Sequence, residues 1–313
     1  MVQTPRIKRK IIILTGPTAI GKSDLAVELA LRFNGEIVGA DSMQIYKGMD
    51  VGTGKITPSE TRGIRHRLID VASPDEPYSA GRFVSDAIRE IDDVSPDRIP
   101  IVTGGTGLYV NALVNGMNLS GSAANSEIRN KWKAVVRDCG LGFVYGKLTE
   151  IDPKSAEKIN ENDEKRIIRA LEIYENTGKP KSIASTAGAS EYDHLLIILT
   201  TDRERLYRRI NMRVEKMFAA GLVDEVKSLQ RYADYQSMQA IGYKQTIAFL
   251  NGDYGDDFTT KDLIDEVAKL SRNYAKRQMT FFRGIRSPRK CYIDANNKRL
   301  IFNLVQEFLN TEN

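Results

Sequence analysis

Eight consecutive residues near the start of the chain have the types and spacing of a phosphate-binding loop. They match the pattern G-x-x-x-x-G-K-[ST] without a mismatch: Gly16, Pro17, Thr18, Ala19, Ile20, Gly21, Lys22 and Ser23. The glycines let the backbone approach an anion, Lys22 can reach the outer phosphate oxygens, and the Ser23 hydroxyl can bind Mg²⁺. The flanks agree, because residues 11–15 form an aliphatic run that predicts a buried strand, and residues 23–33 predict a helix that begins at the anion.

The acid that usually accompanies such a loop in nucleotide hydrolases is missing. Those enzymes carry a carboxylate at the end of a second buried strand, where it holds the metal and orients water. Here the strand expected at residues 99–103 leads into Gly-Gly-Thr-Gly, whereas Asp41 follows the short strand expected at residues 36–40. A carboxylate at that position points into the crevice where open α/β sheets bind ligands. Asp41 is therefore either a general base toward the substrate or the side chain of an Asx turn.

A run of basic residues without any acid lies between positions 269 and 290. It contains Lys269, Arg272, Lys276, Arg277, Arg283, Arg286, Arg289 and Lys290, with Tyr274, Phe281 and Phe282 interleaved. Four of the basic residues recur at helical spacing on one side. A solvated helix face normally includes compensating acids, so the run favours a groove for a polyanion such as nucleic acid. The aromatic residues either belong to the core or form stacking platforms for bases.

The predicted elements indicate an α/β protein with a doubly wound parallel sheet of the P-loop type. Strands at residues 11–15, 36–40, 99–103 and 194–200 are separated by helical stretches, and Asp202 suits the N-cap of the next helix. A long stretch with helical periodicity, including a helix at residues 164–176 that ends at Gly178, predicts a helical insertion domain. We expect a core of residues 1–118 and 191–313, with a mostly helical C-terminal region, and an insertion of residues 119–190.

The composition indicates a folded protein of the reducing cytosol. The 313 residues provide ample apolar material for a core, and the formal net charge is +5. Cys139 and Cys291 lie far apart without metal-ligand spacing, so they suggest neither a disulfide nor a zinc site. The basic tract 6–10 precedes only a short aliphatic run and is interpreted as a solvated lead-in to a strand rather than a targeting or RNA-binding arm. We predict a cytoplasmic protein without membrane segments that acts as a monomer and needs no protein partner.

Five motifs, in this order, closely resemble the bacterial tRNA dimethylallyltransferase family. Besides the phosphate loop they are Asp-Ser-Met-Gln-Ile-Tyr-Lys-Gly-Met-Asp from Asp41, Gly-Gly-Thr-Gly-Leu-Tyr from Gly104, Met-Gln-Ala-Ile-Gly-Tyr-Lys from Met238 and Lys-Arg-Gln-Met-Thr from Lys276. The resemblance implies transfer of a dimethylallyl group from dimethylallyl diphosphate to N6 of the adenosine immediately 3′ of the anticodon (position 37) in tRNA, with release of diphosphate. It also explains the missing acid, because the loop then holds a leaving diphosphate and no water needs activation.

The same resemblance implies roles for individual residues. Lys22 stabilises the leaving group, Ser23 positions Mg²⁺, Asp41 deprotonates the adenine amine, and Thr106 contacts the target nucleotide unless it only caps the next helix. The target base must be flipped into a channel lined by Asp41, Ser42, Met43 and Gln44. The anticodon stem-loop is then expected to be held, mostly by backbone contacts, by Lys165, Arg166, Arg169, Gln239, Gly242, Tyr243, Lys244, Lys276, Arg277, Gln278 and Arg283.

Three rival functions share parts of this pattern. An adenylate isopentenyltransferase would use the same loop and base on a free nucleotide, but it has little need of the basic run. A small-molecule P-loop kinase would transfer phosphate from ATP, and a non-catalytic RNA-binding protein would bind without forming product. The sequence also departs from the family pattern between Gly116 and Glu127, where the Asp-Pro pair that we associate with this stretch is absent.

Overall fold

A six-stranded parallel sheet carries the phosphate loop at the end of a central strand. The computed structural model describes residues 8–117, 125–184, 188 and 190–311. The strand order is β3-β2-β4-β1-β5-β6, formed by β1 (Lys10–Thr15), β2 (Gly35–Gly39), β3 (His66–Arg67), β4 (Ile99–Gly104), β5 (Asp193–Thr200) and β6 (Lys290–Asp294). β1 pairs in parallel with β4 on one side and with β5 on the other. The carboxyl ends of all these strands therefore meet along one edge of the sheet.

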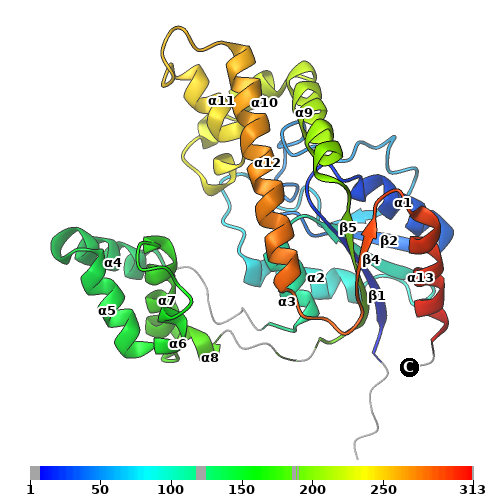
Figure 1. Ribbon diagram of the computed structural model, residues 1–313, viewed down its shortest axis with the longest axis horizontal. Coiled ribbons are helices and arrows are strands. Elements are labelled where there is room, and N and C mark those ends of the chain that lie inside the picture. The colour runs from blue at the N-terminus through cyan, green and yellow to red at the C-terminus, as the bar shows by residue number, and fades with distance from the viewer. Residues whose placement is uncertain (1–7, 118–124, 185–187, 189, 312–313) are drawn as a thin grey trace, which may run out of the picture.

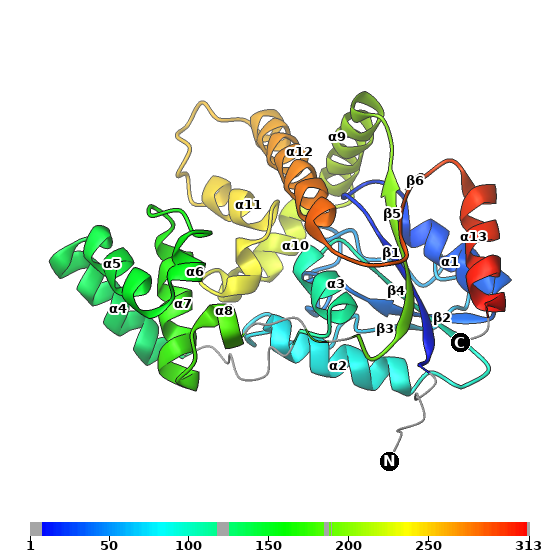
Figure 2. The same cartoon turned by 60° about the horizontal axis from the view of Figure 1, so that its bottom comes forward.

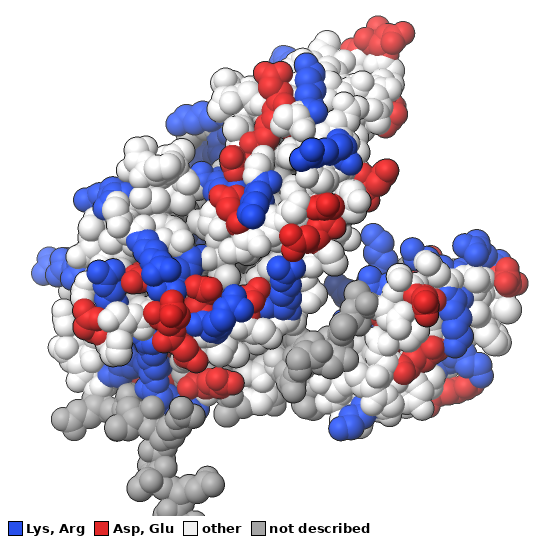
Figure 3. Space-filling view, turned by 180° about the vertical axis from the view of Figure 1, so that it is seen from behind, with Lys and Arg blue, Asp and Glu red and all other residues white. Residues whose placement is uncertain are grey.

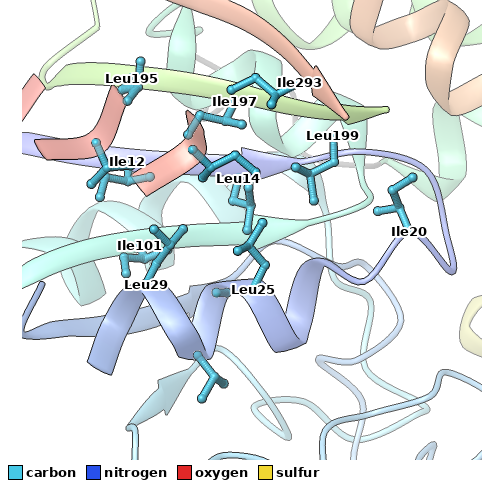
Figure 4. Packing of buried hydrophobic residues seen from close by; sticks show 14 of the residues in the cluster. Ile12, Leu14, Ile20, Leu25, Leu29, Ile101, Leu195, Ile197, Leu199 and Ile293 are labelled. Carbon is cyan, nitrogen blue, oxygen red and sulfur yellow. The ribbon is translucent and has the colours of Figure 1, made fainter. Parts of the chain in front are cut away.

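Helices cover both faces of the sheet and explain why the strands are apolar on both sides (Figure 1). Ile12 and Leu14 face a core shared with α1 (Lys22–Arg32) and α13 (Lys298–Asn310), as Figure 4 shows for the residues near the loop. Ile11 and Ile13 face the opposite core, which is shared with α2 (Ala80–Asp92) and α3 (Gly107–Val114). The alternation follows from the two-residue repeat of a strand.

Beyond β5 the chain forms helices that stand over the carboxyl edge of the sheet. They are α9 (Arg203–Ala219), α10 (Leu222–Ser228), α11 (Tyr243–Leu250) and the long α12 (Thr260–Gly284), with short 3-10 turns at Gln230–Tyr232 and Gln236–Gln239. α9 and α12 pack against each other through Val214, Leu263 and Val267. The end of α12 reaches the sheet, where Phe282 is buried in the same core as α2 and α3.

The insertion forms a body with its own apolar core. Its helices are α4 (Ser126–Cys139), α5 (Leu141–Ile151), α6 (Pro153–Ala156), α7 (Glu164–Thr177) and α8 (Lys181–Ala184). Val144, Leu148, Ile167 and Leu171 fill this core, and Figures 1 and 2 show the helices apart from the sheet. The expected domain bounds at 118/119 and 190/191 lie beside residues outside the described ranges, so they stay predictions. The stretch that lacks Asp-Pro also falls largely outside those ranges.

The structure confirms the predicted fold class and most element positions. The four predicted strands lie within one residue of their expected ends, Asp202 accepts a hydrogen bond from the Arg205 amide as an N-cap, and Gly178 ends α7 with φ 66°. Two strands were overlooked. β3 has two residues, and in β6, which interrupts a region predicted to be mostly helical, only Ile293 is buried.

The expected solvation of the basic tract is wrong for two of its residues. Arg9 donates to the carbonyls of Ile91 and Val94 at the end of α2, at 2.9 and 2.7 Å. Lys10 donates to Phe308 at the end of α13, at 3.0 Å. Cations are favoured at the negative ends of helices, so both side chains cap helices. Within the ranges that the structure describes, no helix combines the length and apolar character needed to cross a bilayer.

Candidate active site

The phosphate loop is pressed between neighbouring elements so closely that glycine is required. A Cβ on Gly16 would lie 2.9 Å from the carbonyl oxygen of Leu199 at the end of β5. Gly21, which precedes α1, has φ 95°, and a Cβ there would lie 3.0 Å from a guanidinium nitrogen of Arg209. L-residues with side chains rarely adopt this left-handed conformation. The loop therefore keeps its backbone exposed to an anion at the start of α1.

Lys22 folds back over the loop. Its Nζ donates to the carbonyls of Gly16 and Pro17, at 3.0 and 2.9 Å. Burial and, to a smaller extent, the Arg213 charge lower the pKa of Lys22 to about 8, and the Asp41 charge opposes this shift. An anion placed in the loop would favour the charged ammonium. The lysine is thus ready to exchange two carbonyl contacts for phosphate oxygens.

Asp41 lies beside this cradle and makes the Asx-turn contact that the sequence left open, while its role as a general base stays a prediction. Its Oδ1 accepts a hydrogen bond from the Met43 amide at 2.9 Å, which is the Asx-turn contact. Its Oδ2 has no hydrogen-bond partner in the described part of the chain and lies 3.9 Å from the Cβ position of Gly105. The Asp41 charge raises the pKa values of both Lys22 and Arg213, although burial lowers them more. One oxygen orients the carboxylate, and the other is left for a ligand.

Thr106 connects the Asp41 turn to the end of β4. Its Oγ1 accepts from the Ser42 amide at 2.9 Å and donates to the Ser42 hydroxyl at 3.2 Å. Thr106 occupies the N-cap position of α3, but its side chain makes no capping hydrogen bond. A Cβ on Gly104 would lie only 2.1 Å from the Ala40 carbonyl oxygen. The glycine-rich turn thus brings the two loops together, and the simple capping role for the Thr106 side chain is wrong.

Two arginines of the site were missed by the sequence analysis. Arg209 and Arg213 lie four residues apart on α9, so they share one face of the helix. Arg209 approaches Gly21, and Arg213 donates to the Thr53 carbonyl at 2.8 Å. Burial lowers the pKa of Arg213, and Asp41 partly offsets this effect. Neither arginine forms an ion pair with an acid among the described residues, which leaves both cations for the anion in the loop. The sequence feature that could have identified them is their four-residue spacing on α9. This helix directly follows β5, which pairs with β1, the strand before the phosphate loop.

The residues predicted to contact tRNA fall into two groups. Seven are exposed: Lys165, Arg166, Gln239, Lys244, Lys276, Arg277 and Arg283. The basic run is partly compensated, contrary to the expectation, because Lys269 pairs with Glu266 at 3.0 Å and Arg289 pairs with Asp193 of β5. Lys276, Arg277 and Arg283 make no ion pair within the described ranges, so these three basic residues lack compensating acids, as the sequence predicted.

The second group uses its polar atoms inside the protein. Tyr243 is fully buried and donates its hydroxyl to Glu225 at 2.5 Å. Gln278 is 5% exposed and bonds two active-site loops. Arg169 donates to the buried Glu172 at 2.6 Å. In this conformation each of these three side chains is committed to an internal partner, and the buried Gly242 supports the turn before Tyr243. The expected contacts of these four residues with tRNA stay predictions.

The aromatic residues of the basic run divide in the same way. Phe282 has no exposed surface and belongs to the core. Phe281 is 42% exposed and lies over Gly107, where a Cβ would come 2.4 Å from its ring. The exposed ring of Phe281 therefore lies close to Thr106, the residue that precedes Gly107.

A basic hollow of about 750 Å³ lies at the far end of α12. Its lining residues are Asn115, Arg283, Gly284, Ile285, Arg286, Ser287, Pro288 and Lys290. Lys290 donates to the carbonyls of Arg283 and Ile285 at 3.2 and 2.6 Å, so one of the three cations of the hollow is used on the helix end. Asn115 ends α3, which starts at Gly107, so about 12 Å of helix separate the hollow from the Thr106 turn.

Comparison with known proteins identifies the family to which a chain with this site belongs. A family model described as IPP transferase matches residues 44–285. The chain belongs to the IPP transferase family. Among its relatives, the tRNA dimethylallyltransferase of Caldanaerobacter subterraneus subsp. tengcongensis is 44% identical over 88% of this chain and 89% of that protein. The tRNA dimethylallyltransferase of Clostridioides difficile is 43% identical over the same shares. The predicted family is therefore confirmed.

Solved structures of this IPP transferase family share the fold. The tRNA isopentenylpyrophosphate transferase of Bacillus halodurans is 40% identical, with a TM-score of 0.70 over 96% of this chain and 97% of that one. A eukaryotic dimethylallyltransferase acting on tRNA is 28% identical, with a TM-score of 0.80 over 96% of this chain and 79% of that one. These solved structures therefore share the fold over nearly the whole of this IPP transferase.

Proposed function

We propose that this IPP transferase moves a dimethylallyl group from dimethylallyl diphosphate to N6 of adenosine 37 in tRNA and releases diphosphate. The observation that carries the proposal is the placement of Asp41. Its charge acts on Lys22 and Arg213 of the anion cradle, while its Oδ2 stays without a hydrogen-bond partner in the described chain. An acceptor for a proton therefore adjoins the place where a diphosphate can leave.

The cradle supports the binding of a diphosphate with Mg²⁺. Lys22, Arg209 and Arg213 supply positive charge around the loop, and the start of α1 adds the positive end of a helix dipole. Mg²⁺ retains several waters and typically takes one or two protein oxygens together with phosphate oxygens. The exposed Ser23 hydroxyl fits that need, and the described residues contain no cluster of three His, Cys, Asp or Glu that could hold a metal alone. Bound there, the ion would neutralise charge on the leaving diphosphate.

The transfer is a displacement in which Asp41 manages the proton. The adenine N6 forms a bond to the allylic C1, the C1–O bond breaks, and its electron pair leaves with the diphosphate. The proton lost by N6 passes to Oδ2 of Asp41. The Thr106 and Ser42 hydroxyls, which bond each other at 3.2 Å, orient the flipped nucleotide. Lys22 and Arg213 stabilise the charge that grows on the departing oxygen.

The exposed cations support a tRNA that lies between the two bodies. Lys276, Arg277 and Arg283 project from α12, and Lys165 and Arg166 project from α7 of the insertion. Figure 3 shows a gap between the two bodies. We infer that these side chains contact the phosphate backbone of the anticodon stem-loop, while Gln239 and Lys244 contact it from the turn before α11 and from α11 itself. Action as a monomer in the cytoplasm remains a further prediction.

The test is a label-transfer assay with the pure protein. Carbon-labelled dimethylallyl diphosphate is offered with an unmodified anticodon stem-loop, with the same RNA carrying guanosine at position 37, and with AMP. Label only in the first RNA supports the proposal. Label in AMP would identify an adenylate isopentenyltransferase, and phosphate transfer from labelled ATP would identify a kinase. RNA binding without any product would leave only a non-catalytic RNA-binding protein.

A further inference from the structure

Gln278 is the polar exception on an apolar helix face. The buried residues of α12 are Leu263, Val267, Ala268, Ala275, Gln278 and Phe282. An amide at such a position loses its hydration and needs internal partners. A methionine of similar length would pack there without that need, so stability alone does not explain a glutamine.

The two ends of the Gln278 amide hold two different loops. Its Oε1 accepts from the backbone amide of Thr18 in the phosphate loop at 2.9 Å. Its Nε2 donates to the carbonyl of Gly105 at 2.8 Å. A Cβ on Gly105 would lie 2.5 Å from that Nε2, so the glycine lets the amide seat directly on the turn. One side chain thus fixes the phosphate loop relative to the turn that carries Thr106.

The same helix turn presents two cations to solvent. Lys276 and Arg277 immediately precede Gln278 and are exposed, whereas Gln278 itself is buried. A shift of α12 when RNA docks on these cations would therefore reach Thr18 and Gly105 through two hydrogen bonds. The Gly105 turn adjoins Asp41, whose Oδ2 lies 3.9 Å from the Gly105 Cβ position.

We propose that Gln278 is a positioning residue that couples RNA docking on α12 to the spacing between the diphosphate loop and the Asp41 site. The inference rests on the proposed function, because it assumes that RNA and diphosphate occupy these two places. Gln278 touches neither reactant; it acts through Thr18 and Gly105.

The test compares Gln278→Met with Leu263→Ala. Met keeps the length of the side chain and removes both hydrogen bonds. Leu263 is buried on the same helix, about 22 Å from Gln278 along the axis, so its truncation controls for loss of stability. At saturating dimethylallyl diphosphate and tRNA, Gln278→Met should lower kcat roughly tenfold or more, the scale of removing two hydrogen bonds, with tRNA affinity within about twofold of the parent. Leu263→Ala should leave kcat of the folded fraction unchanged.

A binding measurement separates this inference from the proposed function. The affinity for inorganic diphosphate with Mg²⁺ is measured with and without the anticodon stem-loop. The parent should bind diphosphate with a different affinity once RNA is present, and Gln278→Met should lose that difference. An equal difference in both proteins, no difference in the parent, or a kcat of Gln278→Met equal to that of the parent overturns the coupling. Failure of the parent to label tRNA overturns the proposed function, while the diphosphate measurement still tests Gln278.

Discussion

At the scale of single residues, Asp41 carries the chemistry and allows a substitution that keeps its structural contact. Asp41→Asn retains an oxygen for the Met43 amide but removes the charge and the basicity. We expect kcat to fall by roughly 10²-fold or more, the usual effect of losing a general base, with tRNA affinity nearly unchanged. Asp50→Asn, on the same loop but with its side chain 58% exposed, serves as the control. Normal turnover of Asp41→Asn would exclude the base assignment.

Lys22 predicts a pH dependence of diphosphate binding. Burial lowers the pKa of Lys22 to about 8 in the free protein, and a bound anion raises this pKa toward the ordinary value of 10.5. Between the two values the complex holds more protons than the free protein, so binding takes up protons, and affinity falls by up to about tenfold per pH unit above pH 8. Calorimetry at pH 9 in buffers of different ionisation enthalpy measures the uptake. Lys22→Met should lose the part of the proton uptake that Lys22 contributes. An unchanged proton uptake in this variant would contradict the prediction.

At the scale of elements, Arg67 joins β3 to β2 and α2. It pairs with Glu36 at 2.8 Å, Glu90 at 2.9 Å and Asp93 at 2.7 Å, and its side chain is only 3% exposed. Removing one partner of a buried pair leaves the other charge unsatisfied. We expect Arg67→Leu to lower the free energy of unfolding by about 3 kcal/mol, measured by urea denaturation. Arg98 also pairs with Glu36, at 3.2 Å, but is 44% exposed, so Arg98→Leu should cost at most about 1 kcal/mol. Similar losses for both variants would refute the role of burial.

The sequence predicted those helices and strands whose own pattern of apolar residues is enough to identify them. The runs of β1 and β5 are apolar throughout because both sheet faces are covered, and the carboxyl-end rule placed Asp41 near the loop before any coordinates. β3 and β6 were overlooked because edge strands of this kind bury few residues. The direction of a polar side chain is set by tertiary packing. For that reason the burial of Gln278 and Tyr243, which were expected to contact tRNA, and the approach of Arg209 and Arg213 to the loop were not foreseen.

At the scale of the whole molecule, charge is not distributed as one positive field. The face in Figure 3 shows Lys and Arg side chains among Asp and Glu, and parts of the basic run have acidic partners. Among the described residues, Lys276, Arg277 and Arg283 of α12 and Lys165 of α7 have no acidic partner, whereas Arg166 of α7 pairs with Asp163 at 3.2 Å. A net charge of +5 therefore has its effect through placement rather than size.

This placement predicts which charges determine the salt dependence of tRNA binding. Replacing Lys276 and Arg277 by Ala removes two cations that have no acidic partner among the described residues. Each phosphate that is no longer neutralised should reduce the slope of log affinity against log salt by about one, so the slope should fall by about two while dimethylallyl diphosphate affinity stays unchanged. The control replaces Lys298 and Arg299, which lie on α13 at the other side of the sheet, and changes the net charge equally. If both double variants reduced the slope to the same extent, net charge rather than a groove along α12 would govern binding.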